Sequence, residues 1–379
     1  MKIAFSPFLK YIFIGVLLSS FLQADPPLKY MKASTINESF VTEGSFQETI
    51  KDNITNEPVY IQKSKEGIPL YYRKIIRDDV CFDKECRKLD IIIYWNITGR
   101  YLGFELPEGE FLSKLDHEPF VESEYQRLHA LLADSSIPLD AVSFEELIEK
   151  PSLKHQDLDA VSGATSKSLA EMVVKGAAYT TYKLWNIVNG PTMDFLSKNT
   201  ENQLTAHLIH LILQSPESFD RVWALHKINS SVPLTPDLEN ALLEIISSDD
   251  FYLSYTAIQA IEAVHLNSFE FQERLFSLYK NANHSIQKEL LKTLMEAPVL
   301  SPKLVGSSKG LLKQLNGQQL ENILALYARH SIYDLETCRA VASILDNENP
   351  FISKKAYHFL VRIKSKDEFI QERLKAYKN

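Results

Sequence analysis

A short run of small and hydroxyl-bearing residues stands out near the middle of the chain, Asp159-Ala160-Val161-Ser162-Gly163-Ala164-Thr165. Gly163 and Ala164 carry little or no side chain, so the backbone there can approach a ligand closely. We predict a helix over 166–188, and the free amides and positive dipole end at its start favour an anion next to Thr165. The run therefore indicates a phosphate pocket with a hydroxyl beside it. The alternative is an ordinary helix cap, a position that serine and threonine also favour.

The pattern Asp-x-x-Ser-Gly-Ala-Thr resembles the flavinylation motif of the FMN-binding domain family, which includes the C subunit of the sodium-translocating NADH:quinone reductase and the G subunit of the Rnf complex. In that family a flavin transferase outside the cytoplasmic membrane splits FAD and joins FMN to the last threonine through a phosphoester. The resemblance implies that Thr165 is the acceptor and that Asp159, Ser162, Gly163 and Ala164 complete the cofactor-binding motif. Lys167 departs from the family, which usually has threonine or serine there.

Two further segments resemble this family. Leu115-Asp116-His117-Glu118-Pro119-Phe120 is similar to its segment with a histidine and an acidic residue, and Gly99-Arg100-Tyr101-Leu102-Gly103-Phe104 to the turn and strand before it. The resemblance covers about 67–190 and adds His117 to the expected cofactor-binding residues. Taken by itself, His117 is more simply read as a surface or capping histidine.

The resemblance implies an electron carrier with covalent FMN rather than a hydrolase or transferase. Its expected partners are a flavin transferase for maturation and a protein redox partner. A covalent bond suits a dilute extracytoplasmic space, where a loosely held flavin would diffuse away, and the flavin itself carries the electron chemistry. Two alternatives stay open: an exported interaction protein with a flavin-free domain, and a reductase that binds FMN without a bond.

The first 24 residues have the layout of a secretory signal peptide. Lys2 and Lys10 precede or flank an apolar run over 11–18, and Gln23-Ala24 ends the segment. The run is shorter than the roughly 20 apolar residues that span a bilayer. We therefore predict a periplasmic or otherwise extracytoplasmic protein, with an uncleaved N-terminal anchor as the alternative.

Export would place Cys81 and Cys86 in an oxidising compartment, where a disulfide is the default. The alternative is that these two cysteines form a redox-active pair. No further cysteine or histidine has the spacing to complete a metal site. Tyr94 and Trp95, adjacent in a predicted strand, must point to opposite faces. Either ring is able to stack on a flavin, although core packing is the simpler role for the one that points inward.

The pattern of elements predicts an α+β domain followed by helices. Residues 25–66 are polar and indicate an extended lead-in with one strand at 58–61. Strands follow at 70–76, 89–97 and 101–106, and helices at 121–133 and 166–188, which together form the expected FMN-binding domain over 67–190. The net charge of -8 excludes a nucleic-acid binder, which needs a basic footprint.

Residues 195–379 lack strand patterns and contain short amphipathic helices that recur about every 33 residues. The second helices of successive units contain 223–225, 256–258, 289–291, 323–325 and 355–357. This recurrence predicts an all-α HEAT-like solenoid that presents an extended surface for protein docking, with an irregular helical bundle as the alternative. His207, His210 and His226 fall in these helices, where ordinary satisfied or exposed histidines are commoner than metal ligands.

Overall fold

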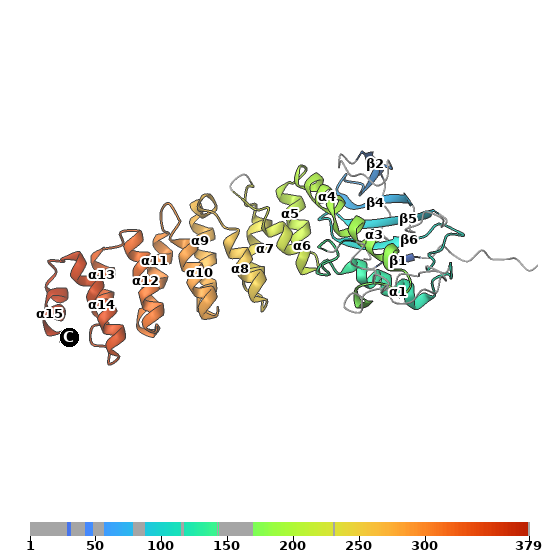
Figure 1. Cartoon of the computed structure of the whole chain (residues 1–379). Coiled ribbons are helices and arrows are strands. Elements are labelled where there is room, and N and C mark those ends of the chain that lie inside the picture. Colours follow the sequence, from blue (N-terminus) through green and yellow to red (C-terminus); the bar gives the residue numbers. More distant parts are fainter. Residues whose placement is uncertain are drawn as a thin grey trace, which may run out of the picture.

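The chain folds into a sheet domain from which a row of helices extends (Figure 1). The computed structural model describes residues 29–31, 42–47, 57–78, 88–114, 117–141, 143, 170–229 and 232–377. No helix within these ranges is long and apolar enough to cross a membrane.

Six strands form one antiparallel sheet in the order β1-β6-β5-β4-β3-β2. The strands are β1 (Lys29–Met31), β2 (Thr42–Phe46), β3 (Val59–Lys63), β4 (Pro69–Asp78), β5 (Leu89–Asn96) and β6 (Tyr101–Glu105). β4 and β5 are rich in β-branched and aromatic residues, which suit a pleated, half-buried surface. The three strands predicted between 70 and 106 are confirmed.

The sheet begins earlier in the chain than we predicted. β1, β2 and β3 all lie within 25–66, where we expected an extended lead-in with a single strand. β1 has three residues, and β2, at the edge of the sheet, has the sequence TEGSF, which lacks an apolar alternation. β1 pairs with β6, and β2 pairs with β3 although its side chains are mostly exposed. The hydrophobic pattern therefore did not reveal these two strands.

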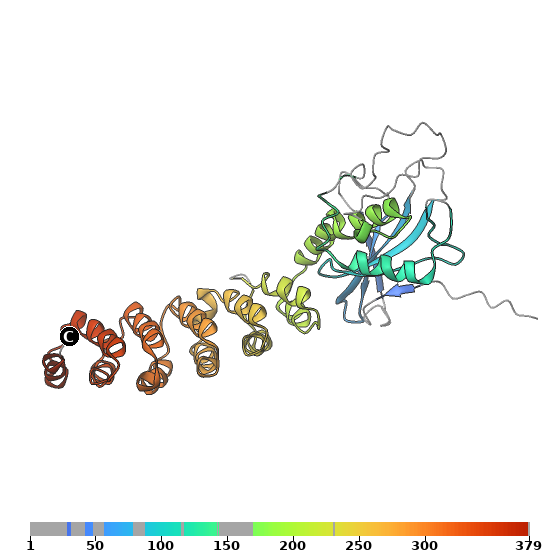
Figure 2. The same cartoon turned by 60° about the horizontal axis from the view of Figure 1, so that its bottom comes forward.

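Three helices cover one face of the sheet: α1 (Glu122–Ala133), α3 (Ala178–Asn189) and α4 (Pro191–Glu201). Figure 2 shows α1 and α3 lying side by side over the strands. Inward-facing Tyr72 and Trp95, both fully buried, pack between the sheet and these helices. The Tyr72 hydroxyl lies 2.8 Å from Thr200 Oγ1 in α4, so α4 belongs with the sheet domain although we placed the end of this domain at residue 190.

Eleven helices, α5–α15, follow among the described residues, and we call them the helical arm. They are α5 (Ala206–Leu213), α6 (Ser218–Leu225), α7 (Pro236–Ile246), α8 (Phe251–Gln259), α9 (Phe269–Ser277), α10 (His284–Leu294), α11 (Pro302–Leu311), α12 (Gly317–Arg329), α13 (Leu335–Ala342), α14 (Pro350–Ile363) and α15 (Glu368–Ala376), with short 3₁₀ turns η3 (Ala263–Asn267), η4 (Leu278–Lys280) and η5 (Leu312–Gln314). They line up pairwise in one row that leads away from the sheet (Figures 1 and 2). The five predicted segments lie in α6, α8, α10, α12 and α14.

The arm repeats with a constant step. α6, α8, α10, α12 and α14 begin at residues 218, 251, 284, 317 and 350, which are 33 apart. The helices between them repeat their N-caps with the same step, at Thr235, Ser268, Ser301, Asp334 and Asp367. Each of these side chains accepts a hydrogen bond from the backbone three residues later, which satisfies an amide that the helix itself leaves free.

Candidate functional site

The two ends of the sheet have different surroundings. Asp78, Leu89 and Glu105 mark one end, which we call the distal end. Asn96 and Arg100 mark the opposite end, next to the helical arm, which we call the junction end. The distal end is where the connection between β4 and β5, with its two cysteines, leaves the described strands.

Helix α3 runs from the distal end to the junction end. At its middle, Lys183 Nζ lies 2.9 Å from Asp78 Oδ2 at the distal end of β4. Near its C-terminal end, the indole nitrogen of Trp95 donates to the carbonyl of Val188 over 2.9 Å. The chain that leads into α3 therefore arrives from the distal end, and this chain contains the predicted flavinylation motif.

A strap of residues 106–121 connects β6 to α1 at the same distal end. The strap folds back on itself, because Ser113 and Pro119 form an antiparallel bridge and the Phe120 amide donates to the Leu112 carbonyl over 2.8 Å. Leu112 is buried, and its amide donates to the Tyr125 hydroxyl of α1 over 2.9 Å. These contacts attach the strap to α1 and leave its tip on the surface.

His117 lies at the exposed tip of this strap. Its backbone has a φ of 61° and its amide donates to the Lys114 carbonyl over 3.0 Å, so it completes a tight turn. Lys114 Nζ also lies 3.1 Å from Glu118 and 3.2 Å from Glu124. Hydrogen bonds to these two carboxylates raise the pKa of Lys114. The turn thus presents His117 on an ion-paired surface at the distal end.

The segment just after the motif packs against this strap. A Cβ atom on Gly176 would lie 3.4 Å from the side-chain carbons of Lys114. Arg127 of α1 donates to the carbonyl of Glu171, and Val173 and Val174 are buried. The structure therefore brings the strap that carries His117 next to residues 171–176, which follow the motif in the chain.

The helix predicted over 166–188 is interrupted, so that prediction is wrong. A 3₁₀ turn, η2 (Ala170–Met172), comes first, and α3 starts only at Ala178. Gly176 has a φ of 76°, a left-handed conformation that glycine adopts without strain and that breaks a right-handed helix. Thr165 consequently precedes the start of α3 by thirteen positions in the sequence, so α3 does not begin beside it in the chain as predicted.

The other residues of the predicted site lie outside the described ranges: Asp159, Ser162, Gly163, Ala164 and Thr165, and likewise Cys81 and Cys86 of the predicted disulfide. The same is true of the predicted signal peptide over 1–24. His117 is the predicted cofactor-binding residue that the structure places.

Tyr94 and Trp95 point to opposite faces of the sheet, as their neighbouring positions require. Trp95 is fully buried beneath α3, so it packs in the core. Tyr94 lies on the other face, where its hydroxyl donates to Glu105 over 2.9 Å. Burial, with the nearby Glu105 carboxylate, raises the pKa of Tyr94.

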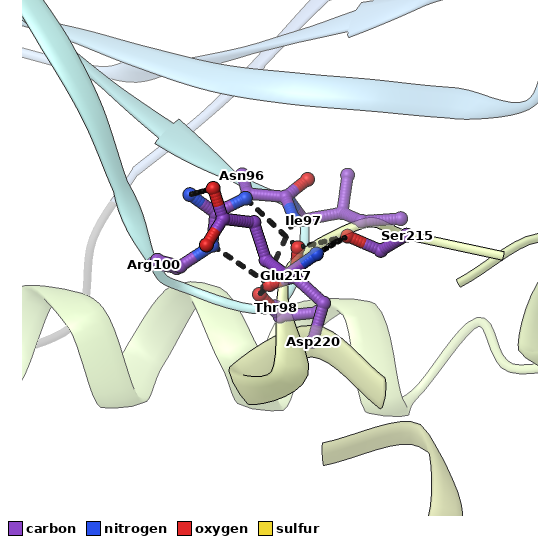
Figure 3. Close-up of polar contacts among 7 residues, drawn as sticks. All are labelled: Asn96, Ile97, Thr98, Arg100, Ser215, Glu217 and Asp220. Atoms are coloured by element: carbon purple, nitrogen blue, oxygen red, sulfur yellow. Dashed lines mark hydrogen bonds and ion pairs between the residues drawn. The ribbon is translucent and has the colours of Figure 1, made fainter. Parts of the chain in front are cut away.

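Sequence patterns did not reveal a buried polar contact at the junction end (Figure 3). Arg100 donates to both carboxylate oxygens of Asp220 in α6, with Nε 3.0 Å from Oδ1 and Nη2 2.8 Å from Oδ2. Thr98 and Ser215 donate to the same carboxylate over 2.8 and 2.7 Å. Asp220 is fully buried, and this network joins the turn between β5 and β6 to the helical arm.

The network keeps Asp220 ionised. Burial alone would raise the pKa of this carboxyl, but the hydrogen bonds and charge of Arg100, together with the hydroxyls of Ser215 and Thr98, lower it below its ordinary value of 3.8. An aspartate in the first turn of a helix is common in any sequence. Its partner 120 residues away therefore left no local signal.

Among the residues that the structure describes, no group of three histidine, cysteine or carboxylate side chains is arranged to hold a metal ion. His207, His210 and His226 are among these described residues. No protein-family model matches the sequence, and no curated protein matches it.

Proposed function

We propose that this protein is an extracytoplasmic electron carrier whose FMN is joined by its phosphate to Thr165. Its sheet domain would belong to the FMN-binding domain type, and its arm would be a HEAT-like solenoid. The observation that carries the proposal is the sequence Asp159–Thr165, with its acidic, small and hydroxyl residues in the order of a flavinylation motif.

The position of the motif in the chain agrees with this proposal. Four residues lie between Thr165 and Ala170 at the start of η2, so the two are five steps apart, and an extended chain spans at most about 3.6 Å per residue. A connection of this length would allow the acceptor hydroxyl to lie at the distal end, because it reaches at most about 18 Å from Ala170. A flavin held there would be away from the junction and accessible to a redox partner.

Three cationic side chains lie on the described surface at the distal end, and one of them, Lys114, is also paired with Glu118 and Glu124. Lys175 is exposed beside Gly176, and Arg127 and Lys114 lie on α1 and the strap. Such cations attract phosphate groups at close range. Under this proposal His117, on the same strap, would contact the ring system of the attached cofactor.

Attachment would replace one bond at a phosphorus atom of FAD with a bond to the protein. The Thr165 hydroxyl would attack the phosphate of FAD that belongs to its FMN half, forming a new P–O bond as the pyrophosphate bond breaks. AMP leaves and the hydroxyl proton is released, with no change of oxidation state. When bound, FMN supplies one- and two-electron transfer, and the protein supplies attachment, orientation and surroundings.

The constant 33-residue step supports the HEAT-like part of the proposal, because a single helical pair cannot cover its own apolar face. Aromatic side chains are exposed on two neighbouring helices close to the junction: Phe219 is 44% exposed in α6, and Phe251 and Tyr252 are 51% and 60% exposed in α8. A surface of this kind suits a protein partner. The arm would then bring the redox partner to the carrier.

Intact mass measurement tests the attachment. The full chain is exported from a host that expresses a flavin transferase, denatured, and analysed by mass spectrometry and in-gel flavin fluorescence. We expect a mass increase of one FMN group that survives denaturation, is lost in Thr165→Ala and is retained in Ser166→Ala, which removes the neighbouring hydroxyl.

The remaining outcomes separate the alternatives. Flavin that binds but is released on denaturation would indicate a non-covalent flavoprotein. A colourless protein, in a host where a known substrate of the transferase is modified, would favour an exported interaction protein in which the arm is the functional part.

A further inference from the structure

Helix α14, near the far end of the helical arm (Figure 1), has an exposed face that combines cations with large apolar side chains. Phe351 is 76% exposed and Val361 is 45% exposed. Lys354 and Arg362 are exposed too, and the spacing of these four residues places them along one side of the helix.

The opposite side of α14 attaches it firmly to the arm. Ala356 and Leu360 are fully buried, and Ser353 is nearly so. Tyr357 stacks on Tyr377 with ring centroids 4.7 Å apart, which holds the segment after α15 against α14. The exposed face is thus held in a fixed orientation by a packed core.

The charge of this part of the chain differs from that of the whole. α14 contains no aspartate or glutamate, and residues 350–377 contain seven lysines and arginines against three acidic residues, while the complete chain carries -8. Within the described ranges, no ion pair involves Lys354, Arg362, Lys364 or Lys366. Elsewhere in the arm many lysines are paired, as Lys303 is with Glu273 over 2.9 Å.

We propose that this face docks on the surface of an anionic lipid bilayer. Lysine and arginine side chains on a helix are attracted to anionic headgroups, and an adjacent aromatic side chain enters the boundary between headgroups and acyl chains. A purely acidic protein partner would neutralise the cations but gives no role to a phenylalanine that is three-quarters exposed among them. This inference concerns the arm alone and does not rest on flavin at Thr165.

Vesicle co-sedimentation tests the proposal with the full chain. We expect the protein to sediment with vesicles that contain phosphatidylglycerol and to stay in solution with pure phosphatidylcholine. Lys354→Glu with Arg362→Glu should weaken partitioning about tenfold or more, because each cation near an anionic surface contributes substantially. Phe351→Ser should weaken binding as well. The binding that remains should still weaken as the salt concentration rises, because the cations are unchanged.

The matched control is Lys288→Glu with Lys313→Glu, which makes the same change in net charge at exposed arm lysines outside α14. Circular dichroism shows whether each variant keeps its helices. Equal binding to both kinds of vesicle, or a loss in the control as large as in the α14 variant, would overturn the proposal. Binding to soluble heparin without binding to vesicles would also overturn it, in favour of an anionic polymer or an acidic protein.

Discussion

Arg100 and Asp220 form a two-pronged ion pair that joins the sheet domain to the helical arm across 120 residues of sequence. The Asp220 side chain is 1% exposed and that of Arg100 is 19% exposed, so water scarcely screens their charges. Two hydroxyls complete the hydrogen bonding of the carboxylate. Because all these partners lie at the base of the arm, the pair fixes how the first helices of the arm meet the sheet.

Removing the cation should destabilise this junction strongly. In Arg100→Gln the Asp220 carboxylate stays buried without its counter-charge, a change that typically costs about 3–5 kcal/mol. We expect a clear drop in the midpoint of chemical denaturation and faster hydrogen exchange in α6. Arg77→Gln, on an exposed arginine that also pairs with acids, is the control and should destabilise the protein far less, because water screens exposed ion pairs. Similar losses in both variants would contradict a special role for the junction.

The same pair predicts a dependence on pH. The pKa of Asp220 is lower in the folded protein than its ordinary value of 3.8, so its contribution to stability is complete above that value and is lost as the pH falls through the lower, folded-state pKa. The difference in unfolding free energy between the native protein and Asp220→Asn should therefore be constant near neutrality and shrink below about pH 4. A difference that stays unchanged down to pH 2 would refute this assignment.

Gly99 offers a test of how closely the turn between β5 and β6 approaches α4. Its φ is 92°, and an added Cβ would lie 2.8 Å from the backbone oxygen of Met193. Gly99→Ala should therefore cost more than the roughly 1 kcal/mol of left-handed strain alone. Gly306→Ala in α11 is the control, because nothing lies within 4 Å of its added Cβ, and alanine should stabilise that helix by about 1 kcal/mol. Chemical denaturation of both variants measures whether each substitution lowers or raises the free energy of unfolding.

Local patterns predicted the parts of the fold that depend on local chemistry. The apolar, β-branched run Ile91-Ile92-Ile93 predicts β5, and the recurring amphipathic pattern of the arm predicts a step of about 33 residues. The broken helix before α3 was missed because apolar periodicity continues through Val173 and Val174, while the left-handed Gly176 depends on its contact with the strap. β2 was missed because pairing at the sheet edge, rather than an apolar face, defines it.

The sequence alone pointed to only part of the candidate site. His117 was singled out from the sequence, and its place beside residues 171–176 follows from packing between the strap and the chain before α3. The pair Arg100 and Asp220 was not singled out, because a contact over 120 residues depends on how the arm meets the sheet. Such tertiary contacts have no periodic signature in sequence.

The repeated caps of the arm lead to a final prediction, about how the arm unfolds. Asn316 accepts from the Gln319 amide over 2.9 Å, and the Gln319 side chain accepts from the Asn316 amide over 2.9 Å, so together they form a capping box at the start of α12. Asn316→Ala should cost about 1 kcal/mol. Gln318→Ala, at the exposed position between them, is the control and should change stability by less than about 0.5 kcal/mol.

The distribution of that loss matters as much as its size. In a repeat array each unit contacts only its neighbours, so Asn316→Ala should speed hydrogen exchange in α12 and in the adjacent α10 and α14. The backbone amides of β4 and β5, at the other end of the molecule, should stay protected from hydrogen exchange (Figure 1). If the amides of the sheet lose protection as much as those of α12, the arm and the sheet domain unfold as one cooperative unit, and the description of the arm as stacked repeats with nearest-neighbour stability fails.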